Sequence, residues 1–266
     1  MNSTTSSQIA KSSTRGDSVG VLSLRIFLRE TRMECLRLLR APSFSVPTIT
    51  FPALFYVLFG IVLGPPHSDA MLARHTLALF IIFGTLAPGL FGLGVTLAMD
   101  RDRGLLQLKR ALPMPPGAYL GAKIAMAMVF SGVVSLLLLL IGLTVAHVML
   151  DVYQCVKLFG LAVFGVWPFC GMGLLLGTAV KGAAAPALLN LVYLPMSFLS
   201  GLLIPLHALP KVFTYLAPAL PPYHLSRLAF SIVDETGSAS VLHAVVPLLM
   251  AVILFVIVCL RLQKLR

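Results

Sequence analysis

Six apolar runs dominate the pattern of hydrophobic and polar positions along the chain. Each is about as long as the roughly 20 residues that an α-helix needs to cross a bilayer, and none contains Asp, Glu, Lys or Arg. The runs cover residues 44–63, 77–99, 124–146, 158–180, 183–204 and 241–260. The pattern therefore predicts an all-α integral membrane protein with six transmembrane helices, forming one membrane domain over 42–260.

The segment before the first run, residues 21–41, has a helical period instead of a continuous apolar character. Its apolar side carries Leu24, Phe27, Leu28, Cys35, Leu38 and Leu39, an adjacent arc carries Arg25, Arg29, Arg32 and Arg40, and Glu30 and Glu34 are placed beyond the arginines. This pattern predicts a basic amphipathic helix lying on the membrane surface. The alternative is a helix that packs on a soluble partner.

The two ends of the chain are polar. Residues 1–20 are rich in Ser and Thr and have no apolar core, which predicts a disordered cytoplasmic tail instead of a cleaved signal peptide. An organellar transit peptide is a weaker alternative. Residues 261–266 are predicted to form a second cytoplasmic tail.

The composition supports a membrane protein and orients it. Of the residues, 58% are hydrophobic and 11% charged, whereas soluble domains carry about 25% charged residues. Sixteen of the 20 Lys and Arg residues precede the first run, follow the last, or lie between the second and third or the fourth and fifth runs. Basic loops stay on the cytoplasmic side, so both termini are expected inside. The net charge of +11 thus reflects topology and not nucleic-acid binding.

The sequence lacks the motifs of several enzyme classes. It has no GxxxxGK[ST] phosphate-binding loop, no HExxH and no GxSxG. Its four cysteines are far apart and form no metal-binding pattern. We therefore expect no catalytic residues, no metal site and no cofactor in this chain.

Two regions carry candidate chemistry. Residues 100–119 read DRDRGLLQLKRALPMPPGAY, a charged and Leu-rich turn that is either a docking element or a solvated connector. In the fifth run, Asn190, Tyr193, Ser197 and Ser200 fall within an arc of about 80°. This polar stripe could line a pathway or could hold helices together. Residues 205–240 contain five prolines, which predicts short re-entrant helices on the extracytoplasmic side.

Together these motifs resemble the membrane subunit (permease) of a type-2 ABC exporter. The coupling-loop pattern of that family is matched by Asp100-Arg101-Asp102-Arg103-Gly104, by Leu108 to Pro113 with Leu112 inside it, and by Ala122-Lys123. Its fifth-helix pattern is matched by Pro195, Phe198-Leu199-Ser200-Gly201 and Pro205. The family often has Glu at the start of the coupling cluster, where this chain has Asp100 and Asp102.

The resemblance implies half of a pore in a cell membrane, most simply a bacterial inner membrane in contact with membrane lipid. It also implies a second permease copy or a related permease, and two cytoplasmic ABC ATPase subunits that hold ATP and Mg. The family pathway would be lined by Thr85, Phe91 and Thr96 together with Asn190, Tyr193, Ser197 and Ser200. An amphipathic cargo such as a drug, natural product or lipid is expected, and a glycan or lipid-linked polysaccharide is the alternative. A membrane scaffold or an intramembrane enzyme is a third.

Overall fold

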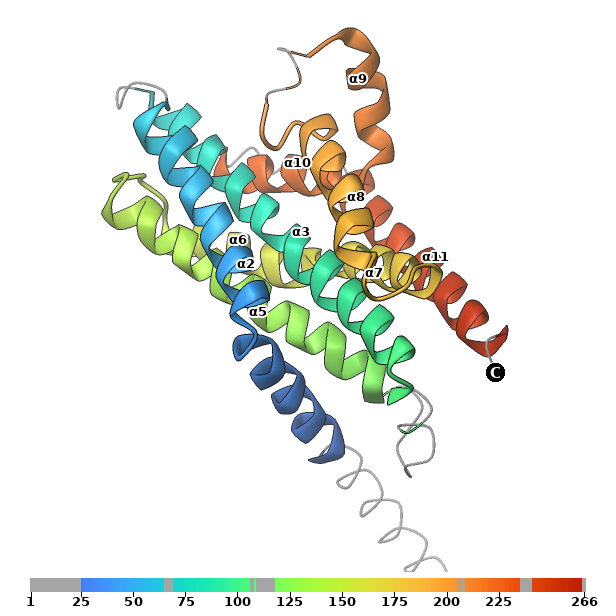
Figure 1. The fold of residues 1–266 in the computed structure, drawn as a ribbon. Coiled ribbons are helices and arrows are strands. Elements are labelled where there is room, and N and C mark those ends of the chain that lie inside the picture. Colours follow the sequence, from blue (N-terminus) through green and yellow to red (C-terminus); the bar gives the residue numbers. More distant parts are fainter. Residues whose placement is uncertain are drawn as a thin grey trace, which may run out of the picture.

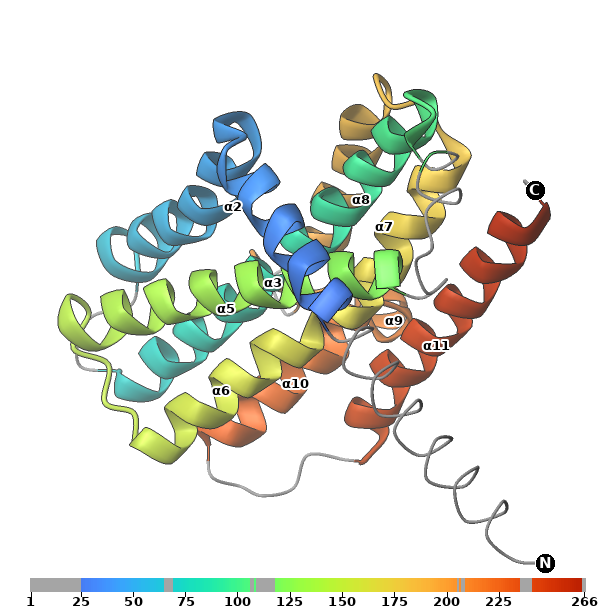
Figure 2. The ribbon, with the colours of Figure 1, turned by 90° about the horizontal axis from the view of Figure 1, so that it is seen from below.

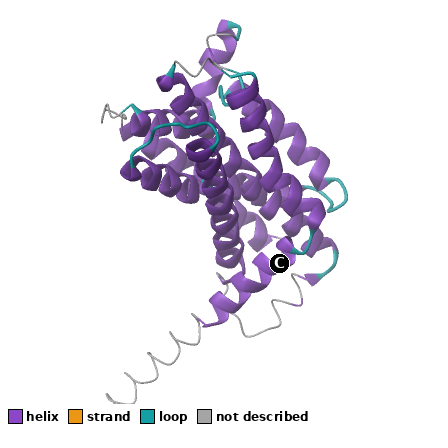
Figure 3. Cartoon of the chain, turned by 90° about the vertical axis from the view of Figure 1, so that its left-hand side faces the viewer, coloured by secondary structure: helices purple, strands orange, loops and turns teal. Residues whose placement is uncertain are grey.

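The computed structural model describes residues 25–64, 69–105, 108, 118–204, 206, 209–234 and 241–264. Within these ranges the regular structure is helical and no strand occurs (Figure 3). Residues 25–39 are helical, and the helices that follow are α2 Pro42–Phe55, η1 Tyr56–Val62, α3 Ala70–Asp102, α5 Ala118–Thr144, α6 Val152–Gly165, α7 Trp167–Ala179, α8 Ala185–Leu199, α9 Lys211–Leu216, η3 Ala217–Ala219, α10 Pro221–Val233 and α11 Val241–Lys264. The all-α prediction is confirmed; the tail predicted over 1–20 lies outside the described residues.

Five helical segments in the described ranges are long and apolar enough to cross a membrane. They are Pro42–Val62, formed by α2 and η1; Ala70–Asp102; Tyr119–Thr144; Val152–Ala179, formed by α6 and α7; and Val241–Arg261. They correspond to five of the six runs in the sequence. The last helix, α11, continues to Lys264, so most of the tail predicted over 261–266 is helical.

The predicted helix over 183–204 is shorter than expected. Its counterpart α8 has 15 residues and is therefore about 22 Å long, less than the roughly 30 Å hydrocarbon core. The helix ends because Gly201 has a positive φ of 80°. There the Gly201 N–H donates to the Phe198 carbonyl and the Leu202 N–H to the Ser197 carbonyl, which is the Schellman pattern. The motif Phe-Leu-Ser-Gly is thus a helix stop.

The predicted run 158–180 is divided into two helices at Val166. The first, α6, begins earlier than predicted because Asp151 caps it: its side chain accepts from the Tyr153 N–H at 3.1 Å, and Gln154 accepts from the Asp151 N–H at 2.9 Å. The second, α7, begins directly after Val166 with Pro168 in its first turn. The two helices diverge from this junction (Figure 2).

The long helix α3 lies at the centre of the molecule, with α2 and α5 on one side and α7 and α8 on the other (Figure 1). It packs most closely on α7 along a glycine seam. A Cβ on Gly173 would lie 2.6 Å from the Gly89 carbonyl oxygen, and one on Gly177 would lie 2.5 Å from that of Gly94. Small residues let membrane helices approach to backbone contact, so this seam fixes α7 against α3.

Candidate functional site: an ion cluster at the ends of three helices

Four charged side chains meet where the helix of residues 25–39 contacts α3 and α5. We call this group, Glu34, Arg37, Asp100 and Lys123, the ion cluster, and the part of the molecule around it the Asp100 end. Glu34 and Arg37 come from the first helix, Asp100 from the last turn of α3 and Lys123 from the second turn of α5. The exposed fractions of Glu34, Asp100 and Lys123 are 3%, 1% and 0%.

The Asp100 carboxylate is the centre of the cluster. Arg37 donates to both of its oxygens, from Nη2 to Oδ1 at 2.8 Å and from Nη1 to Oδ2 at 3.2 Å. The Tyr119 hydroxyl donates to Oδ2 at 2.8 Å. A two-pronged Arg–carboxylate pair is among the strongest side-chain contacts in proteins and fixes orientation as well as distance. Asp100 therefore ties α3 to the helix of residues 25–39 and to α5 at one point.

The Lys123 ammonium group also links the same three helices. Its Nζ lies 3.2 Å from Glu34 Oε2 and 3.3 Å from Asp100 Oδ2, and it donates to Thr96 Oγ1 at 2.9 Å. Thr96 in turn donates to the Gly92 carbonyl at 2.6 Å. Lysine at the end of a membrane helix commonly extends its head to water, whereas Lys123 is held inside by two carboxylates.

The charges of the cluster balance, because two carboxylates face one guanidinium and one ammonium group. Balance is necessary here, since a buried unpaired charge costs several kcal/mol. The hydrogen bond from Arg37 to Asp100 raises the pKa of the Arg37 guanidinium, so this member keeps its charge. The cluster is thus a fixed connection that depends on all four residues.

A second set of contacts joins the end of α3 to the turn between α7 and α8. Arg101 donates from Nη1 to the Thr178 carbonyl and from Nη2 to the Val180 carbonyl, each at 2.6 Å. These carbonyls lie at the C-terminal end of α7, where a cation is favourable. Asp102 accepts from the Gly182 N–H at 2.6 Å. We call these contacts the α7–α8 clamp.

The clamp requires glycine at position 182. A Cβ there would lie 3.0 Å from the Met99 Cα and 3.2 Å from the Met99 backbone nitrogen. These are backbone atoms, which cannot rotate away as a side chain can. The closeness of this turn to α3 is what brings the Gly182 N–H within reach of Asp102.

These contacts change the interpretation of the expected docking residues. Asp100, Arg101 and Asp102 belong to α3 and use their side chains within the chain. Arg103 is exposed, and Gly104 ends α3 with a positive φ of 71°. The remaining candidates, Leu112 and Pro113, lie outside the described residues.

The expected pathway residues are only partly brought together. Tyr193 of α8 is buried and its ring contacts Phe91 of α3, with ring centroids 5.5 Å apart. Ser197 and Ser200 are also buried, and they donate to the carbonyls of Tyr193 at 2.7 Å and Ser197 at 3.4 Å. Asn190, one turn before Tyr193 in α8, is exposed.

Two of the expected pathway threonines lie apart from this group. Thr85 is fully buried, and its hydroxyl donates to the Ile82 carbonyl at 2.7 Å within α3. Thr96 joins the ion cluster through Lys123. The α3–α8 contact includes an aromatic group, in which the Tyr193 ring contacts both Phe83 and Phe91 with centroids 5.6 and 5.5 Å away.

Glu34, Arg37 and Lys123 were not predicted as site residues from the sequence. Glu34 was expected beyond the arginines, and that position is also next to the apolar face, because Glu34 lies seven residues, about two helical turns, after Phe27 and four before Leu38. The structure shows that it is buried there. Opposite charges at neighbouring ends of three predicted helices were a second usable signal.

The fold and these contacts belong to a recognisable class of protein. The ABC-2 type transporter family matches residues 27–233, a range that contains the ion cluster and the α7–α8 clamp. The chain therefore belongs to this family: it is a multi-pass membrane protein and the permease component of an ABC transporter. Such permeases work with an ABC ATPase subunit.

One relative is similar over most of both chains. YvfS of Bacillus subtilis (strain 168), which is named as a transport permease, is 23% identical over 211 residues, covering 79% of this chain and 86% of YvfS.

Proposed function

We propose that the chain is the permease of an ATP-driven exporter in which the ion cluster and the α7–α8 clamp transmit movement from the ATPase to the membrane helices. The observation that carries the proposal is the position of three consecutive residues. Asp100 binds the helix of residues 25–39 and α5, while Arg101 and Asp102 bind the α7–α8 turn. A displacement of the segment that follows α3 therefore moves all of these elements together.

The mechanism assigns different tasks to neighbouring residues. The exposed Arg103 and the residues after it, up to position 119, dock on the ATPase. Asp100, Arg101 and Asp102 carry the movement inward. Switching between inward-open and outward-open states then depends on which state the bound ATPase favours, because a ligand shifts an equilibrium only through differential affinity for the two states.

The basic-residue asymmetry supports the sidedness of the proposal. It favours a cytoplasmic position for both termini and for the Asp100 end, where two ATPase subunits would hold ATP and Mg. The pore is completed by a second permease, either another copy or a related chain, in a bacterial inner membrane. Reporter fusions at Arg266 and near Lys211 test this sidedness: a C-terminus outside the cytoplasm would contradict it.

The cargo proposed is amphipathic: a drug, a natural product or a lipid-like molecule. The α3–α8 contact is made by Phe91 and Tyr193 without charged groups among the expected pathway residues, which suits an apolar or aromatic body. A glycan or lipid-linked polysaccharide is the second candidate.

The test separates docking from transmission in the permease–ATPase complex reconstituted in proteoliposomes. Arg103→Glu reverses an exposed charge, so it should weaken association with the ATPase and make the remaining association less sensitive to added salt, because an attraction that salt screens is lost. Asp102→Asn weakens the internal clamp, so it should leave association unchanged and lower the export of a cationic rhodamine dye. Association is measured by co-purification.

Lys211→Glu is the matched control, because Lys211 is an exposed basic residue at the opposite end of the molecule. All three variants should reach the membrane at wild-type levels. If Arg103→Glu and Asp102→Asn both behave like the control, residues 100–119 are a connector and the proposal is wrong.

A further inference from the structure

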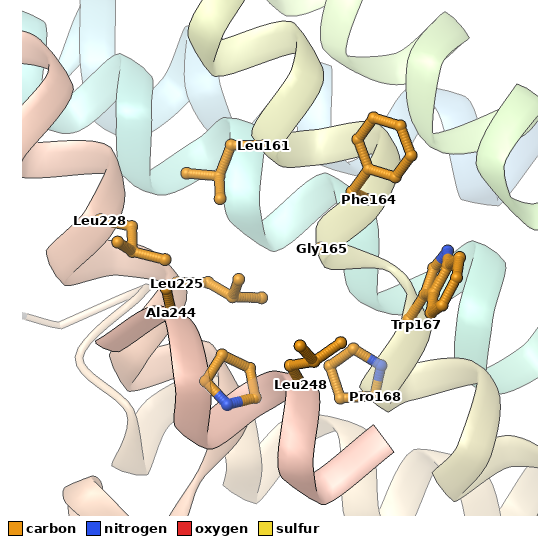
Figure 4. A pocket seen from close by; sticks show the side chains of 10 residues that line it. Leu161, Phe164, Gly165, Trp167, Pro168, Leu225, Leu228, Ala244 and Leu248 are labelled. Carbon is orange, nitrogen blue, oxygen red and sulfur yellow. The ribbon is translucent and has the colours of Figure 1, made fainter. Parts of the chain in front are cut away.

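An apolar pocket opens beside the junction between α6 and α7, away from the ion cluster. Its volume is about 320 Å³. Phe164 and Trp167 border it on the α6–α7 side, Leu228 of α10 and Ala244 and Leu248 of α11 on the other (Figure 4). The pocket thus lies among four helices and in the middle part of the Val152–Ala179 segment.

The break at Val166 explains why a hollow exists here. Gly165, the last residue of α6, has no side chain to fill the space, and a Cβ on it would lie 3.3 Å from Leu225 Cδ2 of α10. Two lining residues, Pro168 and Pro247, have no backbone N–H and therefore add no hydrogen-bond donor to the wall of the pocket. The side chains that line the hollow are not ionisable, and the indole N–H of Trp167 is their single polar group.

We infer that this pocket holds one acyl chain of a membrane phospholipid. Water is a poor occupant, because apolar cavities of about half this volume stay dry and accept benzene. The segment that links α10 to α11 in the sequence, 235–240, reads ETGSAS, which is too polar to fill an apolar hollow within a membrane. Three lining residues, Phe164, Trp167 and Leu248, are exposed, so the pocket opens to the surroundings of the protein. Hydrocarbon chains are those surroundings at the middle of the Val152–Ala179 segment.

The strength of the interaction follows from its chemistry. Lipid tails are as apolar as leucine, so no hydrophobic driving force favours the pocket over bulk lipid. Preference comes from the larger number of van der Waals contacts that a concave wall makes with the chain. The bound chain therefore exchanges with bulk lipid, and while bound it fills the space between the α6–α7 junction, α10 and α11.

Trp167 makes the inference testable, because it is the sole tryptophan in the sequence and it lines the pocket. The full chain is placed in nanodiscs at one copy per disc, with increasing fractions of phosphatidylcholine brominated on its acyl chains. Bromine quenches tryptophan fluorescence on close approach. The fluorescence of each variant in brominated lipid is divided by the fluorescence of the same variant in lipid without bromine.

Ala244→Phe puts a ring into the pocket, and Leu249→Phe adds the same ring at an exposed position of α11 that does not line it. We expect Leu249→Phe to match the wild type and Ala244→Phe to be quenched about twofold less, since the filled pocket loses its contacts with the chain. Leu228→Phe should repeat the effect if Ala244→Phe fails to fold.

Two outcomes would overturn the inference. Equal quenching of the wild type and a folded pocket-filled variant would mean that Trp167 meets surrounding lipid only. Strong quenching at one copy per disc that disappears at two copies per disc would mean that a second copy of the chain covers the pocket. Neither outcome bears on the proposed export function, which rests on other residues.

Discussion

The two ends of the helix bundle are fastened by different chemistry. At the Asp100 end, the connections are ion pairs among Glu34, Arg37, Asp100 and Lys123. At the opposite end, which we call the His75 end, they are histidine contacts. His75 Nε2 lies 2.6 Å from Asp234 Oδ1, joining α3 to the end of α10, and His224 Nδ1 lies 2.9 Å from His243 Nδ1, joining α10 to α11.

The difference lies in how firmly each end is held. At the Asp100 end, the two-pronged Arg37–Asp100 pair fixes orientation as well as distance, and Lys123 joins the same group. The Asp100 end is therefore suited to transmit a mechanical displacement. The His75 end is held by two separate side-chain contacts, each of which joins one pair of elements. The four predictions below test this contrast, from the largest expected effect to the smallest.

The largest effect is expected at Lys123. Replacing it by methionine, which has a similar length, leaves Glu34 and Asp100 facing each other without the ammonium group between them. Loss of one partner from a buried ion group costs about 3–5 kcal/mol, so the melting temperature should fall steeply. Fluorescence-detected size exclusion after heating measures this. Lys211→Met, at an exposed position, is the control, and equal melting of the two variants would show that the cluster does not stabilise the fold.

The next effect is expected at Gly182. In Gly182→Ala, the new methyl group meets the Met99 backbone, so the α7–α8 turn must move away from α3 and the Asp102 contact lengthens. Overpacking of this kind costs about 1–3 kcal/mol. Thermal melting measures the cost. Gly160→Ala is the control, since a Cβ there meets nothing within 4 Å; a wild-type melting temperature for Gly182→Ala would contradict the clamp geometry.

The third prediction concerns the histidine pair at the His75 end. His224 Nε2 faces the Pro218 carbonyl at 2.8 Å, which can only accept, so Nε2 carries the hydrogen and Nδ1 accepts from His243. Losing this bond leaves the buried His224 Nδ1 without its donor and loosens the contact between α10 and α11.

Thermal melting of two variants measures these contacts. His243→Phe, which keeps a ring beside Tyr223, should cost about 1 kcal/mol because His224 Nδ1 loses its donor. His75→Phe should cost at least as much, because a hydrogen bond to a carboxylate such as that of Asp234 is stronger than one between neutral groups. Wild-type melting temperatures for both variants would mean that the histidine contacts do not fasten this end.

The smallest effect is expected at Gly104. Its positive φ of 71° is unfavourable for alanine, and a Cβ there meets no other atom within 4 Å. Gly104→Ala should therefore lower stability by about 1 kcal/mol through backbone strain alone. Gly160→Ala has the same open surroundings within helix α6 and should be neutral or slightly stabilising. Equal melting temperatures for the two variants would mean that α3 does not end in this conformation.

Much of the architecture followed from the sequence, and the exceptions have physical causes. The apolar runs predicted the all-α membrane class and the approximate positions of five long helices, because hydrocarbon admits backbone only when its hydrogen bonds are internally satisfied. The run at 183–204 predicted too long a helix, because it carries no charged residue that would mark the end of α8. Gly201 ends α8 by a backbone conformation that hydropathy does not record.

Some features of the candidate site were also predictable from the sequence, and others were not. The sequence by itself determined the charged group at 100–104, the absence of charge in the apolar runs and the polar stripe of α8, since each is a property of neighbouring residues. Only the tertiary structure decided that Asp100, Arg101 and Asp102 bond to other helices of the chain, that Glu34 is buried, and that Lys123 is held between two carboxylates. Those facts depend on helices far apart in the chain meeting at one end of α3, where burial makes each charge require a partner.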